Sequence, residues 1–162
     1  MDTMTRHLDW YNKEFNQQLT KTDLQGTKIY HRVPSDHVAS VRAYPDHPEF
    51  FVDITPYDDA LSVIEQLHQR YDILIATAAM EHPTSFTPKY NWLVKHLPFL
   101  SPMNFVFCGD KSAVHADYLI DDSPRHFERF RGEGILFTAP HNVAEKRYRR
   151  VDNWGQVKEM FL

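Results

Sequence analysis

Polar side chains that suit phosphate chemistry follow three short apolar runs of the chain. Thr77 closes the run ILIAT, Lys111 follows FVFCGD, and Asp121 and Asp122 end YLIDD. A hydroxyl and the backbone amides after it can donate to an anion, and a lysine can offer its ammonium to a phosphate. Adjacent carboxylates need a cation or hydrogen bonds to offset their repulsion, and hard oxygen ligands of this kind suit Mg²⁺. The three positions together predict a phosphate site with a metal.

Each of these residues also has a simpler interpretation. Thr77 could bond to its own backbone, and Lys111 could be a solvated loop charge. Asp122 could cap a helix that begins near Pro124, although this leaves Asp121 unexplained. The functional interpretation therefore requires a fold that brings the three positions to one place.

The hydrophobic pattern predicts such a fold. Amphipathic spacing predicts a helix over residues 3–19, and short almost wholly apolar runs bounded by turn residues predict strands buried on both faces. Because these strands alternate with helices, the pattern indicates an α/β domain with a mainly parallel sheet, whose ligands lie at the carboxyl ends of the strands. The expected helices after the first lie near 35–43, 56–67, 90–97, 124–131 and 154–161, and the expected strands at 71–79, 104–110, 116–122 and 134–138.

Length and composition exclude several classes of protein. With 162 residues, the chain is expected to form one domain, and ten prolines against five glycines exclude a coiled coil or a collagen. A net charge of −4 does not favour a nucleic acid polymer as partner. The single Cys108 favours a reducing cytoplasm, and no run of residues resembles a membrane span or a signal peptide.

Four segments carry a resemblance to a known family. PEFFVDITPYDDA, ILIATAAMEHPTSFTPKYNWL, FVFCGDKSAVHADYLIDD and ILFTAPHN are together similar to the 5'(3')-deoxyribonucleotidases of the haloacid dehalogenase-like (HAD) phosphatase superfamily, including bacterial members. The resemblance covers roughly residues 48–162 and more weakly the helical segment before them. It implies a Rossmann-like core over 56–162 and a small helical cap-type segment over 1–55.

The resemblance also implies a function and assigns roles to residues. Members of this family are Mg²⁺-dependent phosphomonoesterases that dephosphorylate nucleoside monophosphates through an aspartyl-phosphate. By position, Thr77 would hold the phosphate, Lys111 would pair with it, Asp121 would ligate Mg²⁺ and Asp122 would orient metal-bound water. On the substrate side, Ala78 stands where some relatives carry a serine, and Phe50 or Phe51 looks like the aromatic residue that stacks on the base. A cytoplasmic location and a homodimer complete the expectation.

One motif of the family is absent from the printed sequence. The first motif, an apolar strand that ends in Asp-x-Asp and supplies the nucleophile, has no match, and FFVDITP is no substitute because Thr55 stands where the second aspartate is needed. We expect an N-terminal segment of about ten residues to precede Met1. Without that central strand, which would bury aliphatic side chains worth roughly 10 kcal/mol, we expect a poorly stable or split sheet.

Alternative functions therefore remain. The chain could be a nucleotide- or phosphate-binding protein that lacks its nucleophile, or a HAD phosphatase for another small phosphate ester. The ten histidines form no metal-ligand pattern and are expected mostly at the surface, with a loop-ordering role for His141. Cys108 is expected to act as a buried apolar residue, and KRYRR (146–150) to be a solvated face rather than a polyanion patch.

Overall fold

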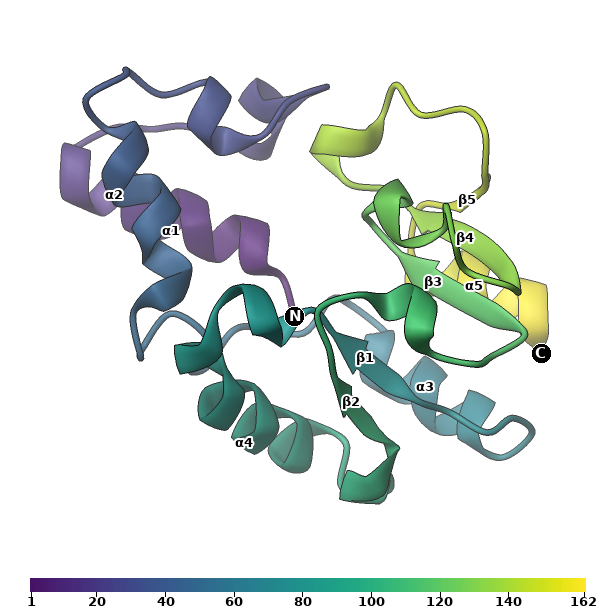
Figure 1. Ribbon diagram of the computed structural model, residues 1–162. Helices are drawn as coiled ribbons and strands as arrows, with labels where there is room; N and C mark the ends of the chain where they lie inside the picture. The colour runs from purple at the N-terminus through teal and green to yellow at the C-terminus, as the bar shows by residue number, and fades with distance from the viewer.

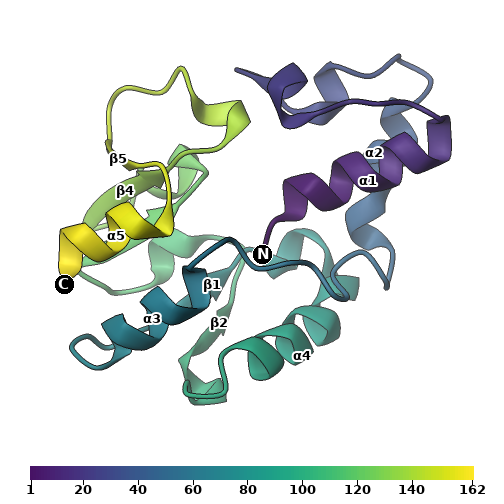
Figure 2. The ribbon, with the colours of Figure 1, turned by 180° about the vertical axis from the view of Figure 1, so that it is seen from behind.

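The computed structural model describes all residues from 1 to 162 and has an α/β architecture. Its α-helices and strands are, in chain order, α1 (Thr3–Phe15), α2 (Val38–Ala43), α3 (Ala60–His68), β1 (Ile75–Thr77), α4 (Phe86–His96), β2 (Phe105–Phe107), β3 (Tyr118–Asp121), β4 (Glu133–Phe137), β5 (Arg149–Val151) and α5 (Trp154–Phe161). The helical segment with α1 and α2 lies to one side of the strands, and α3 and α5 lie behind them (Figures 1 and 2). The predicted fold class is confirmed.

The strands form two separate sheets, and all their pairings are parallel. β1 pairs with β2, while β4 lies between β3 and β5. One side of β1 and one side of β3 therefore carry no partner strand. Residues of both strands line the same largely apolar groove of about 370 Å³, among them Ile75 of β1 and Ile120 of β3. The sheet is thus split, as expected for a parallel sheet that lacks its central strand.

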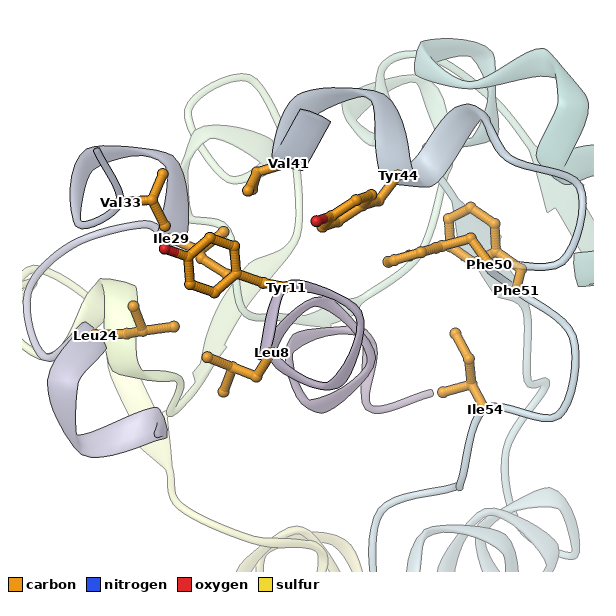
Figure 3. Packing of buried hydrophobic residues seen from close by; sticks show 10 residues of the cluster. All are labelled: Leu8, Tyr11, Leu24, Ile29, Val33, Val41, Tyr44, Phe50, Phe51 and Ile54. Atoms are coloured by element: carbon orange, nitrogen blue, oxygen red, sulfur yellow. The ribbon is translucent and has the colours of Figure 1, made fainter. Parts of the chain in front are cut away.

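The first 55 residues build a hydrophobic cluster of their own. Leu8 and Tyr11 on the inner face of α1 pack against buried residues that reach to Ile54 (Figure 3). The α1 helix begins where the Asp2 carboxylate accepts the amide hydrogen bond of Thr5 at 3.1 Å. It ends at Asn16, whose φ of 48° stops the helix short of the predicted residue 19. The division into 1–55 and 56–162 stays a prediction.

Several predicted elements differ from the observed ones. β1 is shorter than predicted, and its residues are only half-buried, because one side of the strand faces the open groove. The helix expected over 124–131 is a single 3₁₀ turn at Pro124–His126. Within KRYRR, Arg149 and Arg150 lie in the edge strand β5, so part of the predicted solvated face is sheet. Its pairing with β4 is a long-range contact that local charge patterning does not reveal.

The helix expected near 90–97 is α4, and it buries only part of the apolar positions of that segment. Leu93 and Leu97 are buried together with Trp92, whereas Tyr90 and Val94 are each 43% exposed. Lys89 lies on the buried face with Trp92 and Leu93, three and four residues before them. No helix of the protein is both long enough and apolar enough to cross a membrane.

Candidate active site

The predicted site residues line two adjoining cavities at the carboxyl ends of the strands, which share Lys111, Asp121 and Asp122. Thr77 ends β1, Asp121 ends β3, and Lys111 follows β2 by four residues. Lys111, Asp121 and Asp122 line both the apolar groove and a wider cleft of about 480 Å³ that opens toward the helical segment. Because parallel strands bring their carboxyl ends to one edge, the topology assembles residues that are far apart in the sequence.

Lys111 and Asp121 form a close, shielded ion pair. The Lys111 Nζ lies 2.5 Å from the Asp121 Oδ2, and the two side chains are 15% and 5% exposed. The other carboxylate oxygen, Oδ1, accepts the Ser123 amide hydrogen bond at 2.8 Å. Both oxygens of Asp121 are therefore held in place, which fixes the plane of this carboxylate. A charge-assisted pair of this kind also fixes the position of the lysine ammonium.

Asp122 faces the cleft and makes no hydrogen bond to a backbone amide with its side chain. The N-cap of the following 3₁₀ turn is Ser123, so the helix-cap interpretation of Asp122 does not apply. Although its side chain is open to the cleft, the protein around Asp122 withholds part of the solvation of its carboxyl and the neighbouring Asp121 carboxylate adds repulsion, so its pKa is raised. Such a carboxylate gains from any cation that enters the cleft.

Thr77 and Ala78 line the same cavities as this acidic pair but make no hydrogen bond to it. The Thr77 carbonyl accepts the Cys108 amide hydrogen bond at 3.0 Å, but its hydroxyl has no hydrogen-bond partner, so the self-bonded interpretation is wrong. Thr77 lines the apolar groove and Ala78 lines the wider cleft. Cys108 is half-buried and follows the end of β2, rather than lying buried within a strand as expected.

Lys89 is a site residue that the motif analysis missed. Its side chain is nearly buried at 9% exposure, its Nζ lies 4.2 Å from the centre of the Phe51 ring, and no carboxylate pairs with it. Burial and, second, the charge of Lys111 lower the pKa of Lys89 to about 8. The signal in the sequence is its spacing from Trp92 and Leu93, which places a lysine on an apolar helix face.

The two candidate base-stacking residues belong to the hydrophobic cluster and also reach the cleft. Phe50 is fully buried, with its ring 4.7 Å from that of His7 and 5.3 Å from that of Trp10. Phe51 is 4% exposed and faces Lys89. Both line the cleft wall formed by the helical segment. Their role in stacking on a base stays a prediction.

Two histidines of the cleft depart from the expected surface location. His126 is buried at 5% exposure, and burial lowers its pKa. Desolvation also lowers the pKa of His7 to about 4, which leaves a neutral imidazole at the cleft wall at neutral pH. Both residues are therefore uncharged parts of the cleft lining.

No further carboxylate of the chain is free to act as a nucleophile in the cleft. Asp53 is 74% exposed, pairs with Lys95 at 3.2 Å and lies outside the cleft lining, which supports its rejection. Asp2 is held by Lys21 at 2.5 Å and by Thr5. Glu81 lines the cleft but is paired with Arg125.

The donor chemistry of the cleft fits Mg²⁺. Asp121 and Asp122 present hard carboxylate oxygens side by side, and only one cation, Lys111, is paired with them. No set of three or more acidic, histidine or cysteine side chains gathers here. Mg²⁺ is typically held by one or two carboxylates, with water and phosphate oxygens as its other ligands. The basic residues of the lining suit such a phosphate, and they are Lys21, Lys28, Lys89, Lys111 and Arg125.

Comparison with known proteins gives one consistent family. The model of the family described as "5' nucleotidase, deoxy (Pyrimidine), cytosolic type C protein" matches residues 1–162. A Staphylococcus epidermidis protein named "Putative 5'(3')-deoxyribonucleotidase" is 44% identical over 160 residues, which cover 99% of this chain and 89% of that protein. A Staphylococcus aureus protein of the same name is 42% identical over 161 residues, with the same coverage.

A Bacillus subtilis protein named "5'(3')-deoxyribonucleotidase" is 36% identical over 114 residues, which cover 70% of this chain and 66% of that protein. The family match over the whole chain and the agreement among these relatives confirm the resemblance carried by the strand-end motifs. The chain therefore belongs to the deoxy, cytosolic type C family of 5'-nucleotidase hydrolases, within the HAD superfamily.

Proposed function

We propose that this chain carries the site of a Mg²⁺-dependent phosphomonoesterase that dephosphorylates nucleoside monophosphates. The observation that carries the proposal is the shielded Lys111–Asp121 pair next to Asp122, at the carboxyl edge of parallel strands and in a cleft lined by basic residues. The relatives named as 5'(3')-deoxyribonucleotidases favour a deoxyribonucleotide as substrate. A cytoplasmic location and a homodimer stay predictions.

Each site residue has a role in this proposal. The Thr77 hydroxyl and the amide after it bind the phosphate, and the ammonium groups of Lys111 and Lys89 neutralise its oxygens. Asp121 and Asp122 would hold Mg²⁺, which supplies Lewis-acid polarisation of the phosphoryl oxygens when bound. The wall with Phe50 and Phe51 would contact the base or sugar and exclude water from the reacting group.

The nucleophile in this proposal is the first aspartate of an Asp-x-Asp motif, which residues 1–162 do not contain and a further strand would have to supply. The carboxylate of this first aspartate attacks phosphorus, the bond from phosphorus to the nucleoside oxygen breaks, and the second aspartate gives its proton to that oxygen. The second aspartate then takes a proton from water, which attacks the aspartyl-phosphate and releases inorganic phosphate. A strand in the groove between β1 and β3 would bring both carboxylates to Lys111 and Asp121, because both line that groove.

A second candidate function is phosphate or nucleotide binding without turnover. It is favoured because two of the three carboxylates that line the cleft are already paired, Asp121 with Lys111 and Glu81 with Arg125, and the third, Asp122, would serve the metal. A third candidate is the hydrolysis of another small phosphate ester. It would use the same site residues, and only the part of the substrate that contacts the helical segment would differ.

The test compares three proteins: the chain as printed, the chain with an N-terminal extension that carries an apolar strand and Asp-x-Asp, and the same extension with Asn-x-Asn. We expect phosphate release from deoxyribonucleoside monophosphates only with the Asp-x-Asp extension and Mg²⁺. Nucleotide binding by all three without turnover would support the second candidate. A panel of deoxyribonucleotides, ribonucleotides and sugar phosphates separates the first candidate from the third.

A further inference from the structure

Asn142 has a buried side-chain amide that is hydrogen-bonded to the backbone of the acidic pair. Its side chain lies in the loop after β4, is 3% exposed and uses its full hydrogen-bonding capacity. The Nδ2 donates to the Asp122 carbonyl and to the Phe137 carbonyl, each at 2.8 Å. The Oδ1 accepts from the Ala139 amide at 3.1 Å and from the Arg150 Nη1 at 2.9 Å. A buried amide with four partners is rigid.

The hydrogen bond from Asn142 to the Asp122 carbonyl is linked to the Asp121 carboxylate through one planar peptide unit. The carbonyl of the Asp122–Ser123 peptide accepts from Asn142, with the His141 Nε2 also close, at 3.1 Å. The amide of the same peptide donates to the Asp121 carboxylate at 2.8 Å. Because a peptide unit is planar, fixing its oxygen also fixes the direction of its N–H. The orientation of the Asp121 carboxylate therefore depends on Asn142.

Arg150 in turn fixes which way the Asn142 amide points. From β5, its guanidinium donates to the Asn142 Oδ1, to the Thr138 Oγ1, and to the backbone carbonyls of Asn142 and Glu145, at 2.7–3.0 Å. It forms no ion pair with a carboxylate, in contrast to Arg147 and Arg149, so all its hydrogen bonds go to neutral oxygen atoms. An arginine can only donate, so the Asn142 oxygen must face it and the Asn142 NH₂ must face Asp122.

We propose that Asn142 and Arg150 are positioning residues for Asp121 and Asp122, and that they set the affinity of this pair for a divalent cation. The second half of the statement rests on the proposed function, while the first half concerns only the peptide geometry. Residues that orient metal ligands from behind typically change metal affinity about 10–100-fold when they are altered.

The geometry is tested on the metal-free protein by amide hydrogen exchange. Asn142→Asp keeps the shape of the side chain but replaces the donating NH₂ by an oxygen, and Arg150→Met removes the group that orients the amide. In both variants we expect the Ser123 amide to exchange about tenfold faster, since its peptide loses the anchor on its oxygen. The amide of Ile135, buried in β4, reports any global loss of stability and should keep its rate.

The metal affinity is tested by direct binding of Mn²⁺, as a spectroscopic substitute for Mg²⁺, without substrate. We expect the dissociation constant to rise about tenfold in both variants. Arg147→Met is the matched control, because Arg147 lies three residues before Arg150 and pairs with Glu145 away from the acidic pair. It should change neither Mn²⁺ binding nor Ser123 exchange.

Two results would overturn the inference. If Ser123 exchange is unchanged in both folded variants, Asn142 does not position the pair. If exchange accelerates while Mn²⁺ affinity is unchanged, the network orders the loop but does not set cation affinity. A wild-type protein that binds no Mn²⁺ would instead contradict the metal site of the proposed function, and the exchange result would still decide the positioning role.

Discussion

Lys89 is a nearly buried lysine whose ammonium group could neutralise a bound phosphate. Its pKa is lowered to about 8 by burial and by Lys111, whereas a lysine in the unfolded chain titrates near 10.5. Since a bound phosphate requires the ammonium form, we expect kcat/KM of the active protein to fall as the pH rises through about 8. Lys89→Arg, which stays protonated, should shift this decline to higher pH, and a pH-rate profile of both proteins measures it.

The same shift predicts how stability depends on pH. Between about pH 8 and 10.5 the unfolded state binds more protons at Lys89 than the folded state, so this group makes the free energy of unfolding rise with pH in that window. Lys89→Met should remove this rise and add about 2 kcal/mol of stability at pH 7, less than the full shift because part of the side chain remains open to the cleft. Denaturant unfolding at several pH values measures both effects. An unchanged pH dependence would contradict the assignment.

Replacing Asp121 is expected to change both the dependence of activity on Mg²⁺ and the stability of the protein. Asp121→Asn should reduce activity and Mg²⁺ dependence, because the candidate ligand loses its charge. It should also destabilise the metal-free protein by about 3 kcal/mol, since the shielded Lys111 ammonium loses its partner. Asp110→Asn is the control in the same loop, because Asp110 pairs with the exposed Arg129 and its loss should cost little. Full activity of Asp121→Asn at normal metal affinity would refute the assignment.

At the scale of elements, the packing under β4 sets the geometry of β3 and hence of Asp121. Gly134 pairs with Leu119 of β3, and a Cβ placed on it would lie 2.4 Å from the ring of the buried Phe127. We expect Gly134→Ala to destabilise the fold by about 1–3 kcal/mol and to lower activity, because the ring and the strand must move apart. Thermal unfolding together with an activity assay measures both.

Gly109 supplies the comparison for that experiment. A Cβ there would meet only the flexible Met80 side chain at 3.5 Å, an ordinary contact. Gly109→Ala should therefore leave stability nearly unchanged, although Gly109 lies closer to Lys111 in the sequence. Equal losses in the two variants would show that the Phe127 contact does not limit β4.

At the scale of the whole molecule, the main feature is that the parallel strands form two separate sheets. β1 and β3 each have one unpaired side, and both face one apolar groove. Met1 lines this groove beside Asp121 and Asp122, at the carboxyl end of the strands. A strand whose chain continues into Met1 would therefore run parallel to β1 and β3 and could pair with both.

We expect an N-terminal extension with an apolar strand to join the two sheets and raise the free energy of unfolding by roughly 5–10 kcal/mol. Amides of β1 and β3 should become protected from hydrogen exchange. An extension of the same length made of Gly and Ser is the control, because it cannot fill the groove. Equal stability of the two extended proteins would show that the groove does not accept a strand.

The sequence by itself determined the parallel α/β class, four of the five strands and the three strand-end positions that carry polar groups, Thr77, Lys111 and the pair Asp121–Asp122, but not β5. Short apolar runs and small residues report these features locally, because a buried strand needs continuous hydrophobic side chains whatever lies beside it. The helix expected near 154–161 is observed as α5. The resemblance to the nucleotidase family rests on these same local segments.

Only the tertiary structure decided which groups meet. The 2.5 Å contact of Lys111 with Asp121, the hydrogen bond from Asn142 to the Asp122 carbonyl and the one from Arg150 to Asn142 join residues from different strands and loops. The burial of Lys89 depends on what α4 packs against, and β5 forms because its backbone finds β4. Such contacts are absent from local patterns, because burial and pairing are set by neighbours distant in the chain, and these neighbours also fix the charges and pKa values of the cleft.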